Sequence, residues 1–486
     1  MTSDASPLTS ISVFGEAAAV WPVAAMLHAS LPDNFRITVV EDAESNVSSQ
    51  AAALPYEHPF LAAIGVLPQD LIDHCGGVYA LGTEFQNWQT DGSQFFMAQS
   101  GDLPLINGVP IYQWMLSAAR MRGQAARLAE FYAPFRFCAQ AGLAGKIGFP
   151  DEGDQTPRAM LAPVIHFDRH KLSDFLKARL KDQLKAVIVG RPVSISRGPD
   201  AEAVASVRLE DGQSVDTDFF IVVSGKLSEV LDNKAAAATL PLGAADAFDL
   251  VVNMKSAAKS REARADSISL AKAAPESVIM QTSLKDVVLT EKLVLPGGDA
   301  DMSADEAESS RAFNTGALAE PWTGNCLRLG LASACLGPFM AADFRLFSEQ
   351  CLALGNLLPA RTDMHVEAAA FNLKHCEVVE ELRDFTSLPF HLSTRPEEVW
   401  ADARSAEVTD SLKLRLEQFR SRGRFVPYEA EIFDRQNWID TMIGCGVVPE
   451  RADPFARPED LPYVGPALQS IISEFGRTIS QLPARG

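Results

Sequence analysis

The opening of the chain alternates between a strand, a helix and a second strand, and this pattern limits the fold more than any other feature. Ile11 to Phe14 is a short apolar run that Gly15 ends. Ala17 to Leu31 is rich in alanine, the residue with the highest helix propensity. After a Pro-Asp-Asn turn, Ile37 to Val40 is β-branched and is expected to be a strand. A β-α-β unit predicts an α/β fold with parallel strands, a right-handed crossover and helices covering the sheet.

The charge and hydropathy of the chain exclude several classes of partner. Its 486 residues suffice for two or three domains. No apolar run is long enough to span a bilayer, and no basic region precedes the first apolar run, which argues against a signal peptide. A formal charge of −20 repels phosphate backbones and anionic lipids. We therefore expect a cytoplasmic protein without nucleic-acid or membrane partners.

The cysteine and histidine patterns argue against a disulfide framework and against a metal site. The seven cysteines are scattered and include no C-x-x-C pair, which is typical of a reducing cytoplasm. The eight histidines form no His/Glu pair at a metal-ligand spacing on one helix. We expect no metal ion.

Further elements follow along the chain. Asp168 to about Leu184 is amphipathic, with Asp168 as a natural N-cap, and Phe219 to Val223 is expected to be a strand. Gly297 to Ser310 has the composition of a mobile acidic loop. Glu367 to Thr386 and Thr409 to Arg420 are expected to be helices, so the last third is mainly helical.

Several segments, read in order, resemble the signature segments of flavin-dependent tryptophan halogenases. They are Tyr79–Trp88 (YALGTEFQNW), Val164–Phe175 (VIHFDRHKLSDF), Asp218–Leu231 (DFFIVVSGKLSEVL), Asn325–Ala332 (NCLRLGLA) and Phe433–Pro449 (FDRQNWIDTMIGCGVVP). The ordered matches extend over most of the chain. The resemblance implies a Rossmann-type FAD/NAD(P)-binding flavoprotein fold with an interleaved, largely helical substrate domain.

The resemblance also implies domain boundaries. We expect the FAD-binding-like α/β domain to be discontinuous and the substrate-like, mainly helical domain to fill the intervals. The former would comprise residues 1–100, 155–232 and 315–362, and the latter residues 101–154, 233–314 and 363–486.

The cofactor loop departs from the family pattern. The family opens with GGGTAGW, whereas residues 15–21 here read GEAAAVW, so only Gly15 of the three fingerprint glycines remains. Ala17 puts a methyl group where the phosphate approaches, and Val20 puts a branched side chain at the helix–strand contact. Glu16 adds a negative charge at a helix N-terminus that should favour an anion. Glu41 ends the second strand, near the offset at which an acidic residue reaches the ribose. Gly15, Ala17, Val20 and Glu41 are the cofactor-binding candidates, and these changes weigh against tight FAD binding.

The catalytic positions also differ from the family. The halogenase lysine that receives hypohalous acid from the flavin aligns with Ala80, which has neither the reach nor a polar atom. The family's catalytic glutamate aligns with Met340, which cannot accept a proton, and Asp343 replaces a nearby glycine. The W-x-W-x-I-P motif is absent, because no tryptophan lies between residues 230 and 320. No catalytic residue is assigned.

Other residues that invite a functional interpretation are expected to be structural. Trp88, Trp400 and Trp438 are expected to be core anchors. His166 and His391 are expected to be core histidines rather than acid–base groups.

These observations predict a halogenase-family fold that has lost halogenation and acts as a non-catalytic or regulatory homologue. It would bind a small aromatic molecule or another protein, and a homodimer is compatible with the sequence. The alternative is a divergent FAD-dependent monooxygenase or halogenase that acts with a separate flavin reductase and so does not need the lysine relay. A third hypothesis, an assembly subunit, predicts an exposed apolar patch.

Overall fold

The computed structural model describes residues 6–42, 49–98, 103–150, 153, 156–198, 203–231, 239–240, 250–257, 268–294, 309–312, 315–427 and 431–484. The chain divides into two compact units. Unit 1 comprises Met1–Gly77, Phe167–Leu242 and Asn314–Leu382, and unit 2 comprises Val78–His166, Gly243–Phe313 and Arg383–Gly486. No helix among the described residues is both long and apolar enough to cross a membrane.

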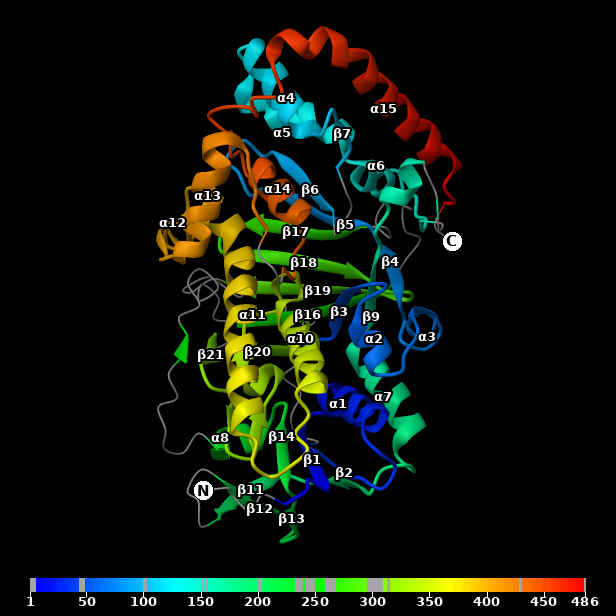
Figure 1. The fold of residues 1–486 in the computed structure, drawn as a ribbon, viewed down its shortest axis with the longest axis vertical. Coiled ribbons are helices and arrows are strands. Elements are labelled where there is room, and N and C mark those ends of the chain that lie inside the picture. The colour runs from blue at the N-terminus through cyan, green and yellow to red at the C-terminus, as the bar shows by residue number, and fades with distance from the viewer. Residues whose placement is uncertain are drawn as a thin grey trace. The chain divides into compact units, whose positions relative to one another are not determined.

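Unit 1 contains a six-stranded sheet in the order β10-β2-β1-β14-β23-β22. Its strands β1, β2 and β14 are labelled in Figure 1. All neighbours in this sheet are parallel except β22, which is antiparallel to β23. The strands are β1 (Ser10–Gly15), β2 (Arg36–Glu41), β10 (Ala186–Val189), β14 (Phe219–Val222), β22 (Trp322–Thr323) and β23 (Cys326–Arg328). The predicted α/β class with a parallel sheet is confirmed.

Helices cover this sheet and carry its connections. Helix α1 (Ala17–Ser30) packs on β1 and β2 and against α7 (Arg169–Leu180). The predicted N-cap of α7 is confirmed, since the Asp168 carboxylate accepts hydrogen bonds from the backbone N–H groups of His170 and Lys171 at 2.9 and 3.2 Å. Unit 1 also contains α2 (Pro59–Ala63), α3 (Pro68–His74), α8 (Lys226–Leu231) and α10 (Ala342–Asn356).

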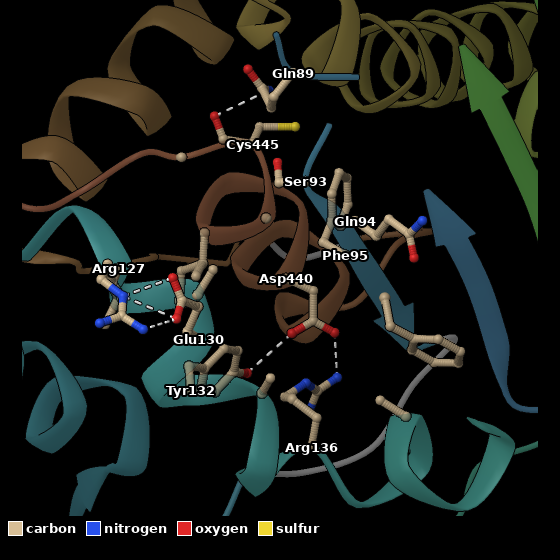
Figure 2. A pocket seen from close by; sticks show the side chains of 18 of the residues that line it. Gln89, Ser93, Gln94, Phe95, Arg127, Glu130, Tyr132, Arg136, Asp440 and Cys445 are labelled. Atoms are coloured by element: carbon tan, nitrogen blue, oxygen red, sulfur yellow. Dashed lines mark hydrogen bonds and ion pairs between the residues drawn. The ribbon is translucent and has the colours of Figure 1, made fainter. Parts of the chain in front are cut away.

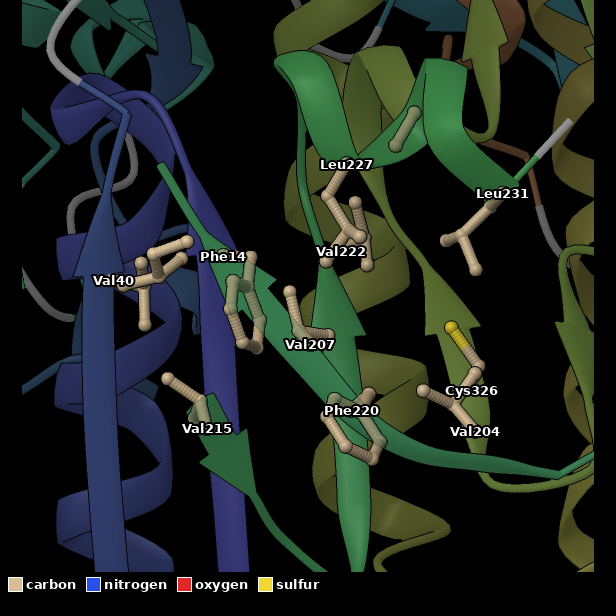
Figure 3. Close-up of a cluster of buried hydrophobic side chains, with 12 residues drawn as sticks. Phe14, Val40, Val204, Val207, Val215, Phe220, Val222, Leu227, Leu231 and Cys326 are labelled. Carbon is tan, nitrogen blue, oxygen red and sulfur yellow. The ribbon is translucent and has the colours of Figure 1, made fainter. Parts of the chain in front are cut away.

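A buried apolar cluster lies between the sheet and a small antiparallel sheet, β11 (Pro192–Arg197), β12 (Val204–Leu209) and β13 (Ser214–Asp216). Phe14 and Phe220 stack at its centre with ring centroids 6.1 Å apart, and Val207 is fully buried beside them (Figure 3). Burial of these side chains fixes β1 and β14 side by side, so the ends of both strands lie together at one edge of the sheet.

Unit 2 contains a seven-stranded sheet in the order β20-β16-β19-β18-β17-β5-β6. Its strands are β5 (Gly82–Gln86), β6 (Gln94–Ala98), β16 (Leu250–Ala257), β17 (Ser269–Ala274), β18 (Ser277–Ser283), β19 (Val287–Val294) and β20 (Ser309–Ala312). The expected boundaries placed residues 78–98 with the α/β domain and residues 233–314 with the substrate-like domain. The contacts place residues 78–98 in unit 2 because β5 pairs with the distant β17. Of the predicted acidic loop, residues 297–308 lie outside the described residues.

Helices complete unit 2: α4 (Ile111–Met121), α5 (Leu128–Tyr132), α6 (Phe137–Leu143), α12 (Glu398–Ser405), α13 (Asp410–Arg422), α14 (Arg435–Gly444) and α15 (Leu461–Gln481). Helix α11 (His365–Leu392) continues through the division between the units in the sequence. The two helices predicted for the last third are therefore confirmed as α11 and α13, with slightly different ends. The remaining strands are short: β3 (Ala51–Pro55), β4 (Val78–Ala80), β7 (Leu105–Ile106), β8 (Val109–Pro110), β9 (Val164–Asp168), β15 (Thr239–Leu240), β21 (Gly316–Leu318) and β24 (Ala334–Cys335).

Candidate cofactor and catalytic positions

The turn between β1 and α1 is shaped by close packing against the end of β14. Gly15 has a φ of +145°, and a Cβ at this position would lie 2.6 Å from Val223 Cγ2 and 2.9 Å from the Ser224 backbone nitrogen. The residue after it, Glu16, donates its backbone N–H to the Ser224 hydroxyl at 2.9 Å. Gly15 is therefore required for the approach of the Val223–Ser224 backbone, and Ser224 satisfies one of the N–H groups that open α1.

The two other loop candidates lie within α1 and take part in its packing. Ala17 is half-buried, and its carbonyl accepts a 2.7 Å hydrogen bond from the Ser173 hydroxyl on α7. Val20 is fully buried in the helix core. The structure thus places Ala17 and Val20 in helix packing, where their β-carbons fill space that glycines would leave open.

Glu41 is held by partners within unit 1. Its carboxylate accepts hydrogen bonds from the Trp21 indole and from the Lys177 ammonium, with the two Lys177 contacts at 2.8 and 2.7 Å. Only 6% of Glu41 is exposed. Both oxygens already have donors in the protein, so a ribose hydroxyl would have to compete with an ammonium for them.

Glu16, Glu41 and Asp42 together form what we call the acidic corner. Gly15 and Glu41 are paired across β1 and β2, and the Asp42 N–H donates to the Gly15 carbonyl at 2.8 Å. All three carboxylate residues are buried, with exposures of 2%, 6% and 5%. The Asp42 carboxylate accepts the backbone N–H of Lys226 at 3.0 Å. The acidic corner occupies the carboxyl ends of β1 and β2, where a Rossmann fold receives the diphosphate and ribose.

The turn that carries Met340 has an unusual backbone. Met340 and Ala341 both lie in the left-handed region, with φ values of 58° and 56°, directly before α10. Met340 is buried, and its carbonyl accepts a hydrogen bond from Arg345 Nε at 3.3 Å. Residues with a β-carbon are disfavoured in this region by roughly 1–2 kcal/mol each.

Asp343 provides an internal anion for the same turn. Its carboxylate accepts the backbone N–H groups of Leu336 and Gly337 at 2.8 and 3.0 Å, and the residue is only 5% exposed. In the family that the chain resembles, the corresponding segment borders the halide site. A carboxylate that already binds backbone N–H groups there opposes a second anion.

A glycine at position 341 tests whether this residue adopts the left-handed backbone conformation. Ala341→Gly is expected to raise the free energy of unfolding by about 1 kcal/mol, because glycine adopts the left-handed conformation without a steric cost. Ala353→Gly, inside α10, is the matched control and is expected to lower it by about 1 kcal/mol. Urea denaturation of both variants gives the comparison. A loss of stability for Ala341→Gly as large as that of the control would contradict the left-handed assignment.

Ala80, which the resemblance aligns with the family lysine, is the last residue of β4 and is fully buried. It pairs with Val164 of β9, and its methyl group offers no atom that could bind or transfer a halogen. The nearest lysine in the sequence, Lys146, is bound elsewhere, since its ammonium donates to the Leu482 carbonyl at 3.0 Å. Ala80 therefore cannot perform the role that the resemblance assigns to the family lysine.

Of the residues expected to lie in the core, the three tryptophans and His166 are buried, whereas His391 is only half-buried. Trp88, Trp400 and Trp438 are fully buried, which confirms that prediction. His166 is also buried, within 3.4 Å of the Ser269 hydroxyl. Burial lowers the pKa of His391 below its ordinary value, so the neutral form is favoured.

The sequence did not identify Ser224, Asp42 or Asp343 as residues that satisfy backbone donors at the ends of the strands. In the structure the Ser224 hydroxyl accepts the Glu16 N–H. The sequence offers a clue to Asp343, because a charged residue stands there in place of a family glycine. The sequence offers no clue to Asp42, since an acidic residue after a strand is ordinarily solvated.

Comparisons with known proteins agree with this fold. The sequence model of the tryptophan halogenase family matches residues 10–268 and 296–460. Tryptophan 7-halogenase RebH from Lentzea aerocolonigenes is 20% identical, in an alignment covering 96% of this chain and 94% of RebH. BrvH, a flavin-dependent halogenase from Brevundimonas sp. BAL3, has a TM-score of 0.87 at 22% identity, covering 98% of both chains. Xcc4156, a flavin-dependent halogenase from Xanthomonas campestris, also has a TM-score of 0.87 at 22% identity, covering 99% of this chain and 97% of Xcc4156. The predicted resemblance and the Rossmann-type flavoprotein fold are confirmed.

Proposed function

The chain belongs to the tryptophan halogenase family, and from this premise we propose that it is a member that does not halogenate and acts as a non-catalytic or regulatory binding homologue. The observation that carries the proposal is Ala80, a fully buried methyl group at the lysine position. Without a long side chain with an amine head, hypohalous acid has no carrier at this position.

The turn around Met340 supports the same conclusion. Met340 offers a thioether where the family has a carboxylate, and a thioether neither takes up a proton nor orients a cation. The Asp343 carboxylate, bound to two backbone N–H groups in the same turn, disfavours a halide there. The lysine position, the glutamate position and the halide turn have therefore all changed.

The residues present also do not fit the diphosphate of FAD in the family pose. Glu16 is a buried carboxylate at the N-cap of α1. Ala17 replaces the glycine beside the phosphate, and Val20 replaces the glycine of the helix–strand contact. The Glu16 N–H, which opens the helix, is bound by the Ser224 hydroxyl. No reaction step is therefore assigned to a flavin here.

A halogenation assay tests the proposal directly. The purified chain, supplied with chloride or bromide, tryptophan or indole, and FADH2 from a flavin reductase in air, is expected to give no halogenated product. A family halogenase in the same reaction serves as the positive control, and product is sought by mass spectrometry from its isotope pattern. A chlorinated or brominated indole above the level of a no-protein control would end this proposal.

A variant shows whether one residue is responsible. Ala80→Lys is expected to remain inactive, because Met340 and the acidic corner are unchanged. The matched control, Ala80→Met, has similar length without the charge and reports whether the position accepts a long side chain. Activity in Ala80→Lys alone would mean that the rest of the machinery is intact.

A further inference from the structure

A cavity of about 700 Å³ lies within unit 2. Its walls come from β6, α5, α6 and α14 (Figure 2). This volume lies inside the range of about 300–1,000 Å³ that is typical of small-molecule sites. Neither Ala80 nor Glu16 nor Met340 is among the described residues that line this cavity.

One part of the wall is apolar and aromatic. Phe95 and Phe96 of β6 are half-buried, and both line the cavity together with Leu143 and Ile443. Phe95 stacks on Phe85 with ring centroids 4.6 Å apart and an interplanar angle of 11°, which holds its ring in place. A ring fixed in this way adds an apolar surface to the wall, against which an organic body can pack.

The floor of the cavity is a buried ion pair in a hydrogen-bonded network. Arg136 and Asp440 are 5% and 3% exposed and form a salt bridge. Asp440 Oδ1 also accepts the Tyr132 hydroxyl at 3.0 Å (Figure 2). The same oxygen accepts the Gln436 amide at 2.7 Å. The charges of Arg136 and Asp440 compensate each other, so the floor contributes a rigid polar surface without net charge.

The described lining as a whole has an excess of negative charge. It holds four carboxylates, from Glu84, Asp91, Glu130 and Asp440, but only two cationic side chains, from Arg127 and Arg136. Arg127 is bound to Glu130 at the rim. The pKa of Asp91 is lowered by a hydrogen bond from the Ser93 backbone N–H, which keeps this carboxylate ionised. A cation entering the cavity is therefore favoured over an anion.

We propose that this cavity is a binding site for a small amphipathic organic cation, with its protonated amine facing the carboxylates and its apolar body on the Phe95–Phe96 wall. The proposal goes beyond loss of halogenation, because it needs no flavin, halide or catalytic group and would hold for an active enzyme as well.

Two fluorescent probes with the same apolar body and opposite charge test the class of ligand. Dansylcadaverine carries a primary ammonium, and dansyl-6-aminohexanoate carries a carboxylate on a linker of similar length. Dansylcadaverine is expected to give a saturable, blue-shifted emission, with an affinity at least about tenfold higher than that of the acid. Equal affinities, or no saturable signal from dansylcadaverine, would overturn the proposal.

Matched variants test the place and the charge. Ala129 of α5 lines the cavity, and Ala129→Trp is expected to abolish the dansylcadaverine signal by filling it. Leu143→Trp is the second blocking variant if Ala129→Trp does not fold by circular dichroism. Asp91→Asn is expected to weaken dansylcadaverine binding by about threefold. Its control is Asp211→Asn, since Asp211 accepts the backbone N–H two residues on at 2.9 Å, as Asp91 does, but lies in unit 1. Binding that survives both blocking variants, or that falls equally in Asp91→Asn and Asp211→Asn, would rule out this cavity.

Discussion

Oxidised FAD is expected to show no saturable binding to this protein at concentrations up to about 1 mM. A dissociation constant of 10 µM corresponds to a binding free energy of about 7 kcal/mol. A dissociation constant above about 1 mM is weaker by at least about 2.7 kcal/mol, or a hundredfold in affinity. The measurement is a titration followed by flavin fluorescence quenching, with absorbance at flavin wavelengths, for the oxidised and the reduced cofactor.

The physical reason is the acidic corner. A diphosphate brought to the N-terminus of α1 would meet Glu16 at the N-cap, with Asp42 beside the same turn, and these carboxylates are buried. Repulsion between charges is stronger in such a place than in water, because the surrounding protein is less polarisable. The attraction that a helix N-terminus offers an anion is a few tenths to about 2 kcal/mol and does not offset this repulsion.

A charge-neutral variant separates charge from shape. Glu16→Gln is expected to improve FAD affinity by about tenfold, or about 1.4 kcal/mol, if the carboxylate is the barrier. Glu229→Gln on α8, a surface residue paired with Lys226, is the control and is expected to have no effect. Saturable FAD binding at or below about 10 µM by the unmodified protein would contradict the expectation and would favour the monooxygenase hypothesis.

The fold of unit 1 could be predicted because its signals are local. A β-branched run, an alanine-rich helix and a second β-branched run lie next to one another, and a parallel pair needs such a crossover. The N-cap Asp168 likewise acts within three residues of its own position. Patterns of this kind are contained in a short window of sequence.

The sheet of unit 2 could not be predicted in the same way. Strand β17 pairs with β5 across a large separation in sequence, and β17 reads SLAKAA, whose small residues lack the β-branched signal of a strand. Its identity as a strand depends on its neighbours in the sheet. The domain boundary expected near residue 100 consequently differs from the division of contacts at Val78.

The candidate site could be predicted in position but not in arrangement. The alignment placed Ala80, Met340 and Glu16 at family positions, and their chemistry follows from the residue types alone. It could not show that Asp343 binds two backbone N–H groups or that Lys177 holds Glu41, since each contact joins segments whose pairing is decided by tertiary structure. The cavity of unit 2 was not predicted, because its residues come from separate segments without a common motif.

Replacing Asp440 by alanine is expected to lower the free energy of unfolding by about 3–5 kcal/mol, because Arg136 would remain buried without its counter-charge. Arg136 Nε already has no hydrogen-bond partner among the described residues, so the guanidinium depends heavily on its bond to Asp440. Chemical denaturation of Asp440→Ala and of the unmodified protein gives the difference. The control is Glu474→Ala, which breaks the exposed pair with Arg477 and is expected to cost less than about 1 kcal/mol.

The double variant Arg136→Met/Asp440→Leu distinguishes an uncompensated charge from a lost contact. If the cost of Asp440→Ala arises from the unpaired guanidinium, removing both charges should recover most of the lost stability, because the buried pair must itself overcome a large desolvation cost. If the hydrogen bonds of Tyr132 and Gln436 to Asp440 are the larger contribution, the double variant will remain about as unstable as Asp440→Ala, since those donors would still lack an acceptor. In that second case the floor of the cavity is maintained by its polar network, and removing the ion pair would loosen the position of Tyr132 in the wall.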